Sequence, residues 1–320
     1  MSPMRAFVSG AAGFVGSHLV NALLERGDDV VAIDCFTPYY DVAAKVANAD
    51  TYRDSPRCTF VQADLRSDPL GALVDGIDVI FHQAAQPGVR QSWDHQFGDY
   101  ASHNVLGTQR LLDAAAGASV GRFVYASSSS IYGNALTYPT REDMMPAPFN
   151  PYGVTKLAAE HLTRAYAQNF GLSTISLRYF TVYGPRQRPD MSIFRLIEAA
   201  LTGGTFPMFG DGSQLREFTY VGDIVRANLL AGSVDVQPGE VCNVAGGSTI
   251  SLRDLVDLVA RESGATIAID AQPAAPGDVT QNAGATDRAL EVLGWRAEVD
   301  LVEGIRAQIE WHRARASARR

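Results

Sequence analysis

The stretch NPYGVTK, residues 150–156, places a tyrosine and a lysine four positions apart, just after an Asn-Pro pair. Asn150 is a good N-cap and Pro151 fits the first position of a helix, so a helix is expected to begin here. Tyr152 and Lys156 would then lie one turn apart on one face of that helix. The ammonium would favour the phenolate, which makes Tyr152 a candidate acid or base. The alternative is an exposed aromatic side chain with a lysine nearby.

A glycine-rich turn, SGAAGFVGSHLV at residues 9–20, follows the first apolar run and opens a helical pattern. Gly10 would allow a tight turn, Gly13 the close approach of a pyrophosphate, and Gly16 close packing of the helix on a sheet. Free N–H groups at the start of the helix would hold the anion. The spacing G-x-x-G-x-x-G matches the general dinucleotide fingerprint only loosely, and a purely structural turn is the alternative.

Asp34 ends the second apolar run, roughly 20 residues beyond the glycines, where a carboxylate can accept hydrogen bonds from a ribose. Its charge would repel a 2′-phosphate, and residues 35–37 offer no Arg or Lys to hold one. These features favour NAD over NADP as the cofactor. Asp34 could instead cap the helix that follows.

Six short apolar runs, each followed by a helical pattern, predict the elements that position these residues. Near-continuous apolar strands that alternate with helices are typical of a parallel sheet covered on both faces. The expected fold class is therefore α/β with a doubly wound parallel sheet, and the serines at 128–130 would lie at the edge where ligands bind. The runs are at residues 5–9, 29–34, 59–64, 78–85, 122–128 and 173–179.

The pattern loosens beyond residue 180, where Gly- and Pro-rich turn signals become frequent. We expect residues 1–180 to form a dinucleotide-binding domain and residues 181–320 a smaller substrate-binding lobe. The border is not expected to be one clean cut, because the segment 216–231 could return to the first domain. Parts of 216–245 are therefore assigned to that domain.

The composition restricts the class of protein. With 320 residues, 46% hydrophobic and 19% charged, the chain is long enough for one large or two modest domains. A formal net charge of −8 without a lysine-rich block argues against nucleic-acid binding. Three widely spaced cysteines fit reduced thiols, and six scattered histidines give no zinc spacing, so no metal is expected. Without a signal peptide or an apolar stretch of about 18 residues, we expect a cytoplasmic protein with no membrane partner.

Taken together, these motifs resemble those of the extended short-chain dehydrogenase/reductases over nearly the whole chain. The resemblance rests on the glycine turn, Asp34, Asp64, HQAA (82–85), Asn104 in NVLGT, the serine cluster, YGVTK and RYF (178–180). It implies a Rossmann fold with bound NAD. It also implies that Ser128 hydrogen-bonds the reacting oxygen, that Tyr152 is the acid/base, and that Lys156 binds the nicotinamide ribose and lowers the tyrosine pKa. The cofactor-binding residues that it implies are Gly10, Gly13, Phe14, Val15, Gly16, Asp34, Asp64, Leu65, Ala84, Ala85, Tyr152, Lys156 and Tyr179.

The second lobe resembles the nucleotide-sugar branch of this family. In the segment 206–224, the resemblance implies that Phe209 adjoins uracil and that Arg216 pairs with a diphosphate, for which a planar guanidinium is well suited. Asp278 matches a position near the nucleotide ribose. An ordinary solvated Arg216 is the alternative.

Two serines narrow the expected reaction. Dehydratases and decarboxylases of this branch carry acidic residues where this chain has Ser129 and Ser130. Serine hydroxyls donate hydrogen bonds but do not readily remove a proton from carbon. The expected reaction is therefore a simple epimerisation at C4 of a UDP-sugar.

Two segments, 38–45 and 183–195, resemble those of UDP-glucuronate 4-epimerases more than those of UDP-galactose 4-epimerases. Arg186, Arg188 and Arg195 would supply positive potential for a substrate that carries a diphosphate and a carboxylate. The family pattern puts the sugar carboxylate near Ser129, Ser130, Thr181 and Arg188.

Three other functions stay open from the sequence. The first alternative is a UDP-glucose/UDP-galactose 4-epimerase, and the others are a UDP-glucuronate decarboxylase and a non-catalytic NAD-sensing protein. Sensing would not need Ser128, Tyr152 and Lys156, which argues against the last of these. The resemblance further implies a homodimer that pairs through helices near 93–116 and 151–169.

Overall fold

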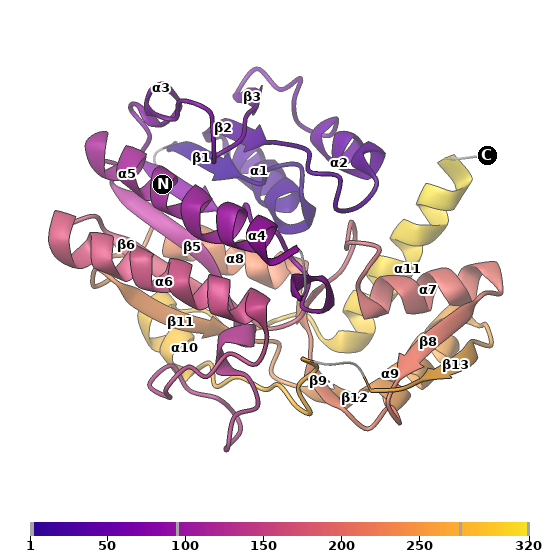
Figure 1. Ribbon diagram of the computed structural model, residues 1–320. Helices are drawn as coiled ribbons and strands as arrows, with labels where there is room; N and C mark the ends of the chain where they lie inside the picture. The colour runs from indigo at the N-terminus through magenta and orange to yellow at the C-terminus, as the bar shows by residue number, and fades with distance from the viewer. Residues whose placement is uncertain (1–2, 94–95, 275–276, 319–320) are drawn as a thin grey trace.

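Seven parallel strands form the central sheet of the computed structural model, which describes residues 3–93, 96–274 and 277–318 (Figure 1). Every pairing between neighbours is parallel, in the order β11-β6-β5-β4-β1-β2-β3. The six predicted apolar runs all supply strands of this sheet, and the predicted fold class is confirmed. The strands are β1 (Arg5–Ser9), β2 (Asp29–Asp34), β3 (Cys58–Gln62), β4 (Val79–His82), β5 (Arg122–Ser128), β6 (Thr174–Tyr179) and β11 (Glu240–Val244).

Helices cover both faces of the sheet, because successive strand residues point to opposite sides and both sides are apolar. In β1, for example, Ala6 and Val8 belong to one apolar core and Phe7 to the other. The long helices on the two faces are α1 (Phe14–Arg26) with α8 (Val221–Ala231) on one, and α5 (Gly107–Gly117) with α6 (Pro151–Phe170) on the other (Figure 1).

The strand order reverses at β1, since the chain moves outward to β2 and β3 and then returns to β4 on the other side. Open α/β sheets bind ligands outside the carboxyl ends of their strands at such a switch point. β1 ends at Ser9 and β4 at His82, and the glycine turn and residues 83–85 follow directly. The topology therefore brings several predicted site residues to one edge of the sheet.

Helix α6 begins as its sequence predicts. Asn150 is the N-cap, and its Oδ1 accepts a hydrogen bond from the Gly153 N–H at 2.8 Å. Pro151 is the first helical residue. The helix ends before Gly171, whose φ of 70° lies in the left-handed region that glycine adopts without strain. The predicted helix with its tyrosine and lysine one turn apart is thus confirmed.

A smaller lobe with its own apolar core lies beside the large sheet (Figure 1). Buried Ile193, Leu255 and Ile305 bring three of its helices together in that core. Its elements are α7 (Ser192–Thr202), β8 (Thr205–Phe209), β9 (Leu215–Glu217), β12 (Thr249–Ser251), α9 (Leu252–Ser263), β13 (Ala268–Gln272) and α11 (Leu301–Ala318). β8 pairs in parallel with β13, and β9 pairs antiparallel with β12.

The chain passes between these two parts more than once. A short parallel pair, β7 (Val182–Tyr183) and β10 (Thr219–Tyr220), precedes the return of the chain to the large sheet. α8 then packs against α1, and β11 pairs with β6 at the edge of the sheet. α10 (Asp287–Leu293) packs on β11 before the chain leaves for α11.

Short elements complete the chain. The segment predicted as one helix near 93–116 is divided among α4, the π-helical η3 and α5, and residues 94 and 95 lie outside the described residues. The short elements are α2 (Val42–Ala49), α3 (Gly71–Val74), η1 (Arg90–Ser92), α4 (Phe97–Tyr100), η3 (Ala101–Leu106) and η4 (Ser129–Tyr132).

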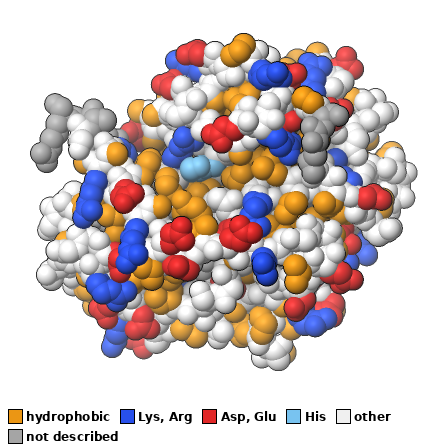
Figure 2. All heavy atoms as spheres, turned by 180° about the vertical axis from the view of Figure 1, so that it is seen from behind, with side chains coloured by type: hydrophobic (Ala, Val, Ile, Leu, Met, Phe, Trp, Pro, Cys, Tyr) orange, Lys and Arg blue, Asp and Glu red, His pale blue; other side chains and the backbone are white. Residues whose placement is uncertain are grey.

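On the face shown in Figure 2, Lys and Arg side chains lie among Asp and Glu side chains rather than in one block. The three cysteines are free thiols, with Cys242 buried and the other two half-buried. Within residues 3–93, 96–274 and 277–318, the structure has no helix with the length and apolarity needed to cross a membrane.

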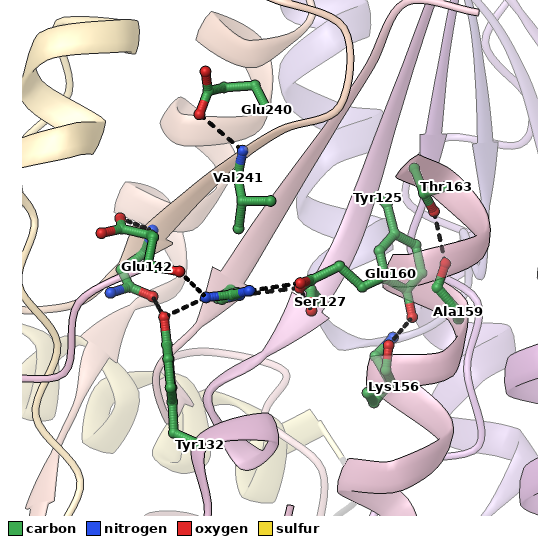
Figure 3. Close-up of polar contacts among 12 residues, drawn as sticks. Tyr125, Ser127, Tyr132, Glu142, Lys156, Ala159, Glu160, Thr163, Glu240 and Val241 are labelled. Carbon is green, nitrogen blue, oxygen red and sulfur yellow. Dashed lines mark hydrogen bonds and ion pairs between the residues drawn. The ribbon is translucent and has the colours of Figure 1, made fainter. Parts of the chain in front are cut away.

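A buried ion pair ties α6 to the sheet. Arg178 on β6 donates from Nε to Oε2 of Glu160 at 3.1 Å and from Nη2 to Oε1 at 2.6 Å. Ser127 on β5 donates to the same carboxylate at 2.6 Å, and Nη1 of Arg178 donates to the Tyr132 hydroxyl at 2.6 Å. Figure 3 shows Glu160 reaching from α6 to Ser127. Because both side chains of the pair are only 5–6% exposed, each compensates the burial of the other.

Replacing Arg178 alone by Met is expected to lower the free energy of unfolding by about 3–5 kcal/mol, since the Glu160 carboxylate would stay buried without its cation. The double variant Arg178→Met/Glu160→Leu is expected to regain most of that loss. Chemical denaturation followed by circular dichroism measures both. Arg141→Ala is the matched control, because its ion pair with Asp143 is exposed on the surface and its loss should hardly move the midpoint. A single variant as stable as the wild type would contradict the assignment.

Candidate functional site

One cavity of about 860 Å³ is lined by all the residues that the sequence predicts for the site except Arg186. Its walls come from the carboxyl edge of the large sheet and from the smaller lobe, so residues distant in sequence face one space. The predicted residues that line it are Gly10, Gly13, Phe14, Val15, Gly16, Asp34, Asp64, Leu65, Ala84, Ala85, Ser128, Ser129, Ser130, Tyr152, Lys156, Tyr179, Thr181, Arg188, Arg195, Phe209, Arg216 and Asp278.

The glycine turn at one end of the cavity has little room for side chains. Gly10 has a φ of 68°, and a Cβ there would lie 2.8 Å from the backbone of Ala84 on the neighbouring strand connection. A Cβ on Gly16 would lie 2.1 Å from the carbonyl oxygen of Gly10. The turn therefore packs tightly against the segment after β4 and against its own helix. The positive φ of Gly10 is the tight turn that the sequence predicts, whereas Gly16 contacts the turn itself rather than the sheet.

Helix α1 presents an uncapped N-terminus to the cavity. Its N-cap is Gly13, so no side chain occupies the first N–H groups and they are available to an anion. Asp34 stands next to this turn, where Oδ2 accepts from the Ala12 N–H at 3.1 Å and Oδ1 from the Phe36 N–H at 2.8 Å. The alternative that Asp34 caps the next helix is wrong, because Asp41 is the N-cap of α2.

Ser128 and Tyr152 form a hydroxyl pair near the middle of the cavity. Ser128 is the last residue of β5, and its Oγ accepts from the Ser130 N–H at 3.1 Å, which fixes its rotamer. Tyr152 projects from the first turn of α6 and packs edge-on against Tyr100 with ring centroids 6.3 Å apart, and it lies close enough to Ser128 for that hydroxyl to lower its pKa. The strand end and the helix start thus bring both hydroxyls to one point.

The electrostatic surroundings of Tyr152 act in opposite directions. Burial raises the pKa of Tyr152, whereas the hydrogen bond with Ser128 and the positive charge of Arg188 lower it. The Nζ of Lys156 lies over the Tyr125 ring, 4.4 Å from its centroid. Burial lowers the pKa of Lys156 to about 7, and the Glu160 carboxylate opposes this. Arg188 therefore favours the phenolate, a contribution that the motif spacing, which pairs Tyr152 with Lys156, does not predict.

Asn104 on η3 forms hydrogen bonds with the loop after β4 and with the first turn of α6, the turn that carries Tyr152. Its Oδ1 accepts from the Gln86 N–H at 2.7 Å, and its Nδ2 donates to the Gln86 carbonyl at 3.1 Å and to Thr155 Oγ1 at 3.0 Å. The π-helical turn η3 carries this residue, and such turns are frequent at functional sites. Asn104 thereby holds the loop after β4 against the first turn of α6.

Two further predicted cofactor residues are held by polar partners. Asp64 is paired with Arg66 at 2.7 Å, and hydrogen bonds from Arg66 lower the pKa of Asp64. The Tyr179 hydroxyl accepts from Nδ2 of Asn228 at 2.7 Å and donates to Oε1 of Gln83 at 3.2 Å, which links β6 to α8 and to the segment after β4.

The guanidinium of Arg188 forms an ion pair with Asp190. Its Nε and Nη2 donate to the two carboxylate oxygens of Asp190, each at 3.0 Å, and the Tyr39 hydroxyl donates to the same residue at 3.4 Å. Burial lowers the pKa of Arg188, but Asp190 outweighs this and keeps the guanidinium charged. Thr181, predicted beside Arg188, accepts from Nδ2 of Asn282 at 3.2 Å. Sequence reasoning missed Asp190, although it stands only two positions from the arginine.

Arg186, which the sequence analysis grouped with Arg188 and Arg195, lies outside the cavity wall. Its charge acts instead on His18 within α1 and on Tyr52 just after α2. The prediction that Arg186 adds positive potential to the substrate site is therefore not supported by its position, whereas Arg188 and Arg195 do line the cavity.

The smaller lobe contributes Phe209, Arg216 and Asp278 to the far end of the cavity. An arginine that the sequence analysis did not select joins them. Arg90 from η1 pairs with Asp278 at 2.9 Å, and its Cζ lies 3.8 Å from the centroid of the Phe209 ring. Arg90 lies two residues after Gly88 in the segment that follows β4, and sequence spacing could not connect it with residue 278.

Several known proteins are similar to this chain over nearly its whole length. A UDP-glucose 4-epimerase from Mycolicibacterium smegmatis is 38% identical over 97% of this chain and 99% of its own length. The crystal structure of UDP-glucuronic acid 4-epimerase from Bacillus cereus with UDP-glucuronic acid and NAD is 38% identical, with a TM-score of 0.94 over 97% of this chain and 99% of that one. The structure of MoeE5 with UDP-glucuronic acid and NAD is 44% identical, with a TM-score of 0.89 over 97% and 99%.

The family model for the NAD dependent epimerase/dehydratase family matches residues 6–245, which include the glycine turn, the hydroxyl pair and Lys156. This span covers most of the chain, and relatives above 30% identity cover nearly all of it. The chain therefore belongs to the NAD dependent epimerase/dehydratase family.

Proposed function

We propose that this protein is an NAD-dependent isomerase that inverts C4 of UDP-glucuronate to give UDP-galacturonate. The observation that carries the proposal is the hydroxyl pair of Ser128 and Tyr152 with Arg188 acting on the same tyrosine, all in one cavity with an uncapped helix N-terminus. Solved relatives bound to NAD and UDP-glucuronic acid support it.

The residues at the glycine end of the cavity fit a dinucleotide. The turn leaves no space for Cβ atoms at Gly10 and Gly16, the N-terminus of α1 is free for a pyrophosphate, and Asp34 can accept from ribose hydroxyls. NAD, when bound there, supplies the uptake and return of the C4 hydride. Asp34 has no neighbouring cation within residues 35–37, which disfavours a 2′-phosphate.

The chain's own residues handle the proton. The Tyr152 phenolate takes the proton of the sugar 4-hydroxyl and later returns it, while Ser128 donates a hydrogen bond to the oxygen as it becomes a carbonyl. Inversion requires the sugar to present its other face to the same two residues. A cavity that extends from the tyrosine to the nucleotide residues of the smaller lobe allows the sugar to turn while the nucleotide stays bound.

The sugar carboxylate is recognised near Ser129, Ser130, Thr181 and Arg188. Guanidinium and hydroxyl donors suit a carboxylate, and residues 129 and 130 have no acid group that would assist loss of CO₂ or water. This composition favours epimerisation over decarboxylation. Tyr152 and Lys156 are both present, so a purely NAD-sensing role is disfavoured.

UDP-glucose is the second candidate substrate. Arg188 already donates two hydrogen bonds to Asp190, so its charge is partly compensated before any ligand binds. A neutral hexose could therefore be accommodated beside Arg188, and the mycobacterial relative is named a UDP-glucose 4-epimerase.

Assembly as a homodimer and location in the cytoplasm stay predictions. Leu106 on η3 and Val154 on the first turn of α6 are exposed apolar side chains, which is consistent with pairing through these helices. The mass of the protein in solution tests the first, and cell fractionation the second.

Incubation of the purified protein with NAD and UDP-glucuronate is expected to give UDP-galacturonate without net formation of NADH. Proton NMR of the sugar identifies the product. Tyr152→Phe is the control and should reduce turnover by at least ~10²-fold, because it removes the acid/base hydroxyl but keeps the ring. A pentose product with released CO₂ would assign a decarboxylase, and epimerisation of UDP-glucose alone would assign the second candidate.

The activity is expected to rise with pH through the pKa of Tyr152, because the phenolate is the base. Ser128→Ala removes a hydrogen bond that lowers this pKa, so the rising limb of the kcat profile should move to higher pH. Ser128→Thr keeps a hydroxyl and should restore the position of the limb. If Ser128→Ala lowered the maximal kcat but left the rising limb of the pH profile at the same pH, Ser128 would not set the pKa of Tyr152.

Replacing Arg188 by Ala is expected to slow both substrates, since the cation also favours the phenolate. UDP-glucuronate should lose a further ~10- to 150-fold in kcat/KM relative to UDP-glucose, which corresponds to about 1.5–3 kcal/mol for a charged hydrogen bond. The ratio of the two kcat/KM values separates these effects. Equal losses would show that Arg188 does not bind the carboxylate.

A further inference from the structure

Two buried glutamines hold the loop that carries Arg188 and Asp190. Gln187 lies in the loop itself and Gln308 lies on α11, and these residues are only 2% and 0% exposed. The Nε2 of Gln308 donates to Oε1 of Gln187 at 2.8 Å. α11 also packs against α7, the helix that follows the loop (Figure 1). A buried amide pair therefore connects α11 with the loop, across 121 positions of sequence.

Gln308 fixes the start of the loop through the backbone. Its Oε1 accepts a hydrogen bond from the Gly184 N–H at 2.9 Å. Gly184 directly follows β7 and has a φ of 134°, and a Cβ there would lie 2.7 Å from Cγ1 of Val221. The chain therefore leaves β7 along a path that only glycine fits well, and Gln308 binds the amide at that point.

Gln187 fixes the end of the loop. Its Oε1 also accepts from the Phe194 N–H at 3.0 Å, and its Nε2 donates to the Val182 carbonyl at 3.0 Å. Phe194 is the third residue of α7, and the N-cap of this helix is Met191, whose side chain has no oxygen to accept from that N–H. Gln187 therefore supplies the missing cap and defines where α7, with Arg195 of the cavity wall, begins.

The backbone partners determine the orientation of both amides. The N–H groups of Gly184 and Phe194 can only donate, and the Val182 carbonyl can only accept. If either amide rotated by 180°, it would place a donor against a donor or an acceptor against an acceptor. All four polar atoms of the two side chains have partners, and a buried network that is fully satisfied specifies one arrangement of the backbone around it.

We infer that Gln308 is a positioning residue for substrate selectivity, which acts through Gln187 to hold the Arg188 guanidinium where it meets the sugar carboxylate. The inference rests on the proposed function, because it requires that Arg188 binds UDP-glucuronate. Arg188 directly follows Gln187 in the chain, and its ion-pair partner Asp190 belongs to the same loop. Both therefore move with the backbone that the amide pair holds. A misplacement of about 1 Å in a binding group can cost ~10²-fold in rate.

The two candidate substrates depend differently on this loop. UDP-glucose has no carboxylate, so its binding does not need a charged hydrogen bond from Arg188. Loosening the loop should therefore change the preference between the two substrates. A residue that only stabilised the fold would lower the activity with both substrates alike.

Steady-state kinetics of the NAD-loaded Gln308→Met variant with both UDP-sugars tests the inference. Methionine has a similar length and no amide, so the variant loses both hydrogen bonds of Gln308 with little change in volume. The kcat/KM for UDP-glucuronate is expected to fall by ~10- to 100-fold relative to that for UDP-glucose, mainly through KM. Hydrogen exchange of the peptide 184–194 should also become faster, because the Gly184 N–H loses its acceptor.

Ile309→Ala is the matched control. It removes a buried apolar side chain from the next position of α11, so it weakens the packing of this helix without removing a side-chain hydrogen bond. It should lower the midpoint of chemical denaturation and leave the ratio of the two kcat/KM values unchanged. Gln187→Met breaks the same amide pair from the loop side, and should lower the ratio even if Gln308→Met does not fold.

Equal changes of the substrate ratio in Gln308→Met and Ile309→Ala would mean that Gln308 only stabilises α11, and would overturn the inference. An unchanged ratio in Gln308→Met, together with a lower ratio in Arg188→Ala, would overturn it and leave the proposed function intact. A wild-type protein that epimerises neither UDP-sugar would remove the proposed function, and the selectivity role with it.

Discussion

Parallel strands end on the same edge of their sheet, and this constraint determines where the chemistry of this protein can lie. Ser9, Asp34 and Ser128 are the last residues of their strands, and Tyr179 ends β6 beside them. Residues separated by more than a hundred positions therefore meet without any long-range pairing signal in the sequence. The smaller lobe closes the open side of that edge and converts it into a cavity.

Buried charge is the second requirement, because an activated tyrosine needs cations that water does not screen. Arg178 and Glu160 neutralise each other below the strand ends, and Arg188 is neutralised in part by Asp190. Each cation thus has a carboxylate that permits its burial. The arrangement around Lys156 differs, since its Nζ lies over an aromatic ring and its pKa is about 7. A lysine poised in this way responds to any charge that a ligand brings.

Local signals in the sequence were sufficient for the parts of the fold that short-range physics determines. The strands at 29–34 and 122–128 agree with their predicted limits, and the cap at Asn150 follows from side-chain chemistry alone. β11 was not predicted as a strand, because its five residues lack a distinctive apolar run and gain their place by pairing with β6. The roles predicted for the site residues stay predictions, although all of these residues except Arg186 line one cavity.

Sequence spacing cannot provide contacts that the tertiary structure creates. Arg90 and Asp278 are 188 positions apart, and only the folded chain brings them together. The division of the helix near 93–116 by a π-helical turn was also missed, since the turn reflects the packing of Asn104 between Gln86 and Thr155 rather than a local preference. Arg186 was grouped with Arg188 by proximity in sequence, but a backbone φ of 64° at Arg186 separates their directions.

The position of β11 affects how the protein can be made. This strand completes the large sheet at its β6 edge, yet it is encoded after most of the smaller lobe's first elements. During synthesis, the growing chain must keep the edge of β6 unpaired until residue 244 has left the ribosome. An unpaired strand edge is a site of association between nascent chains. The final quarter of the polypeptide therefore protects the first part from aggregation as well as supplying a wall of the cavity.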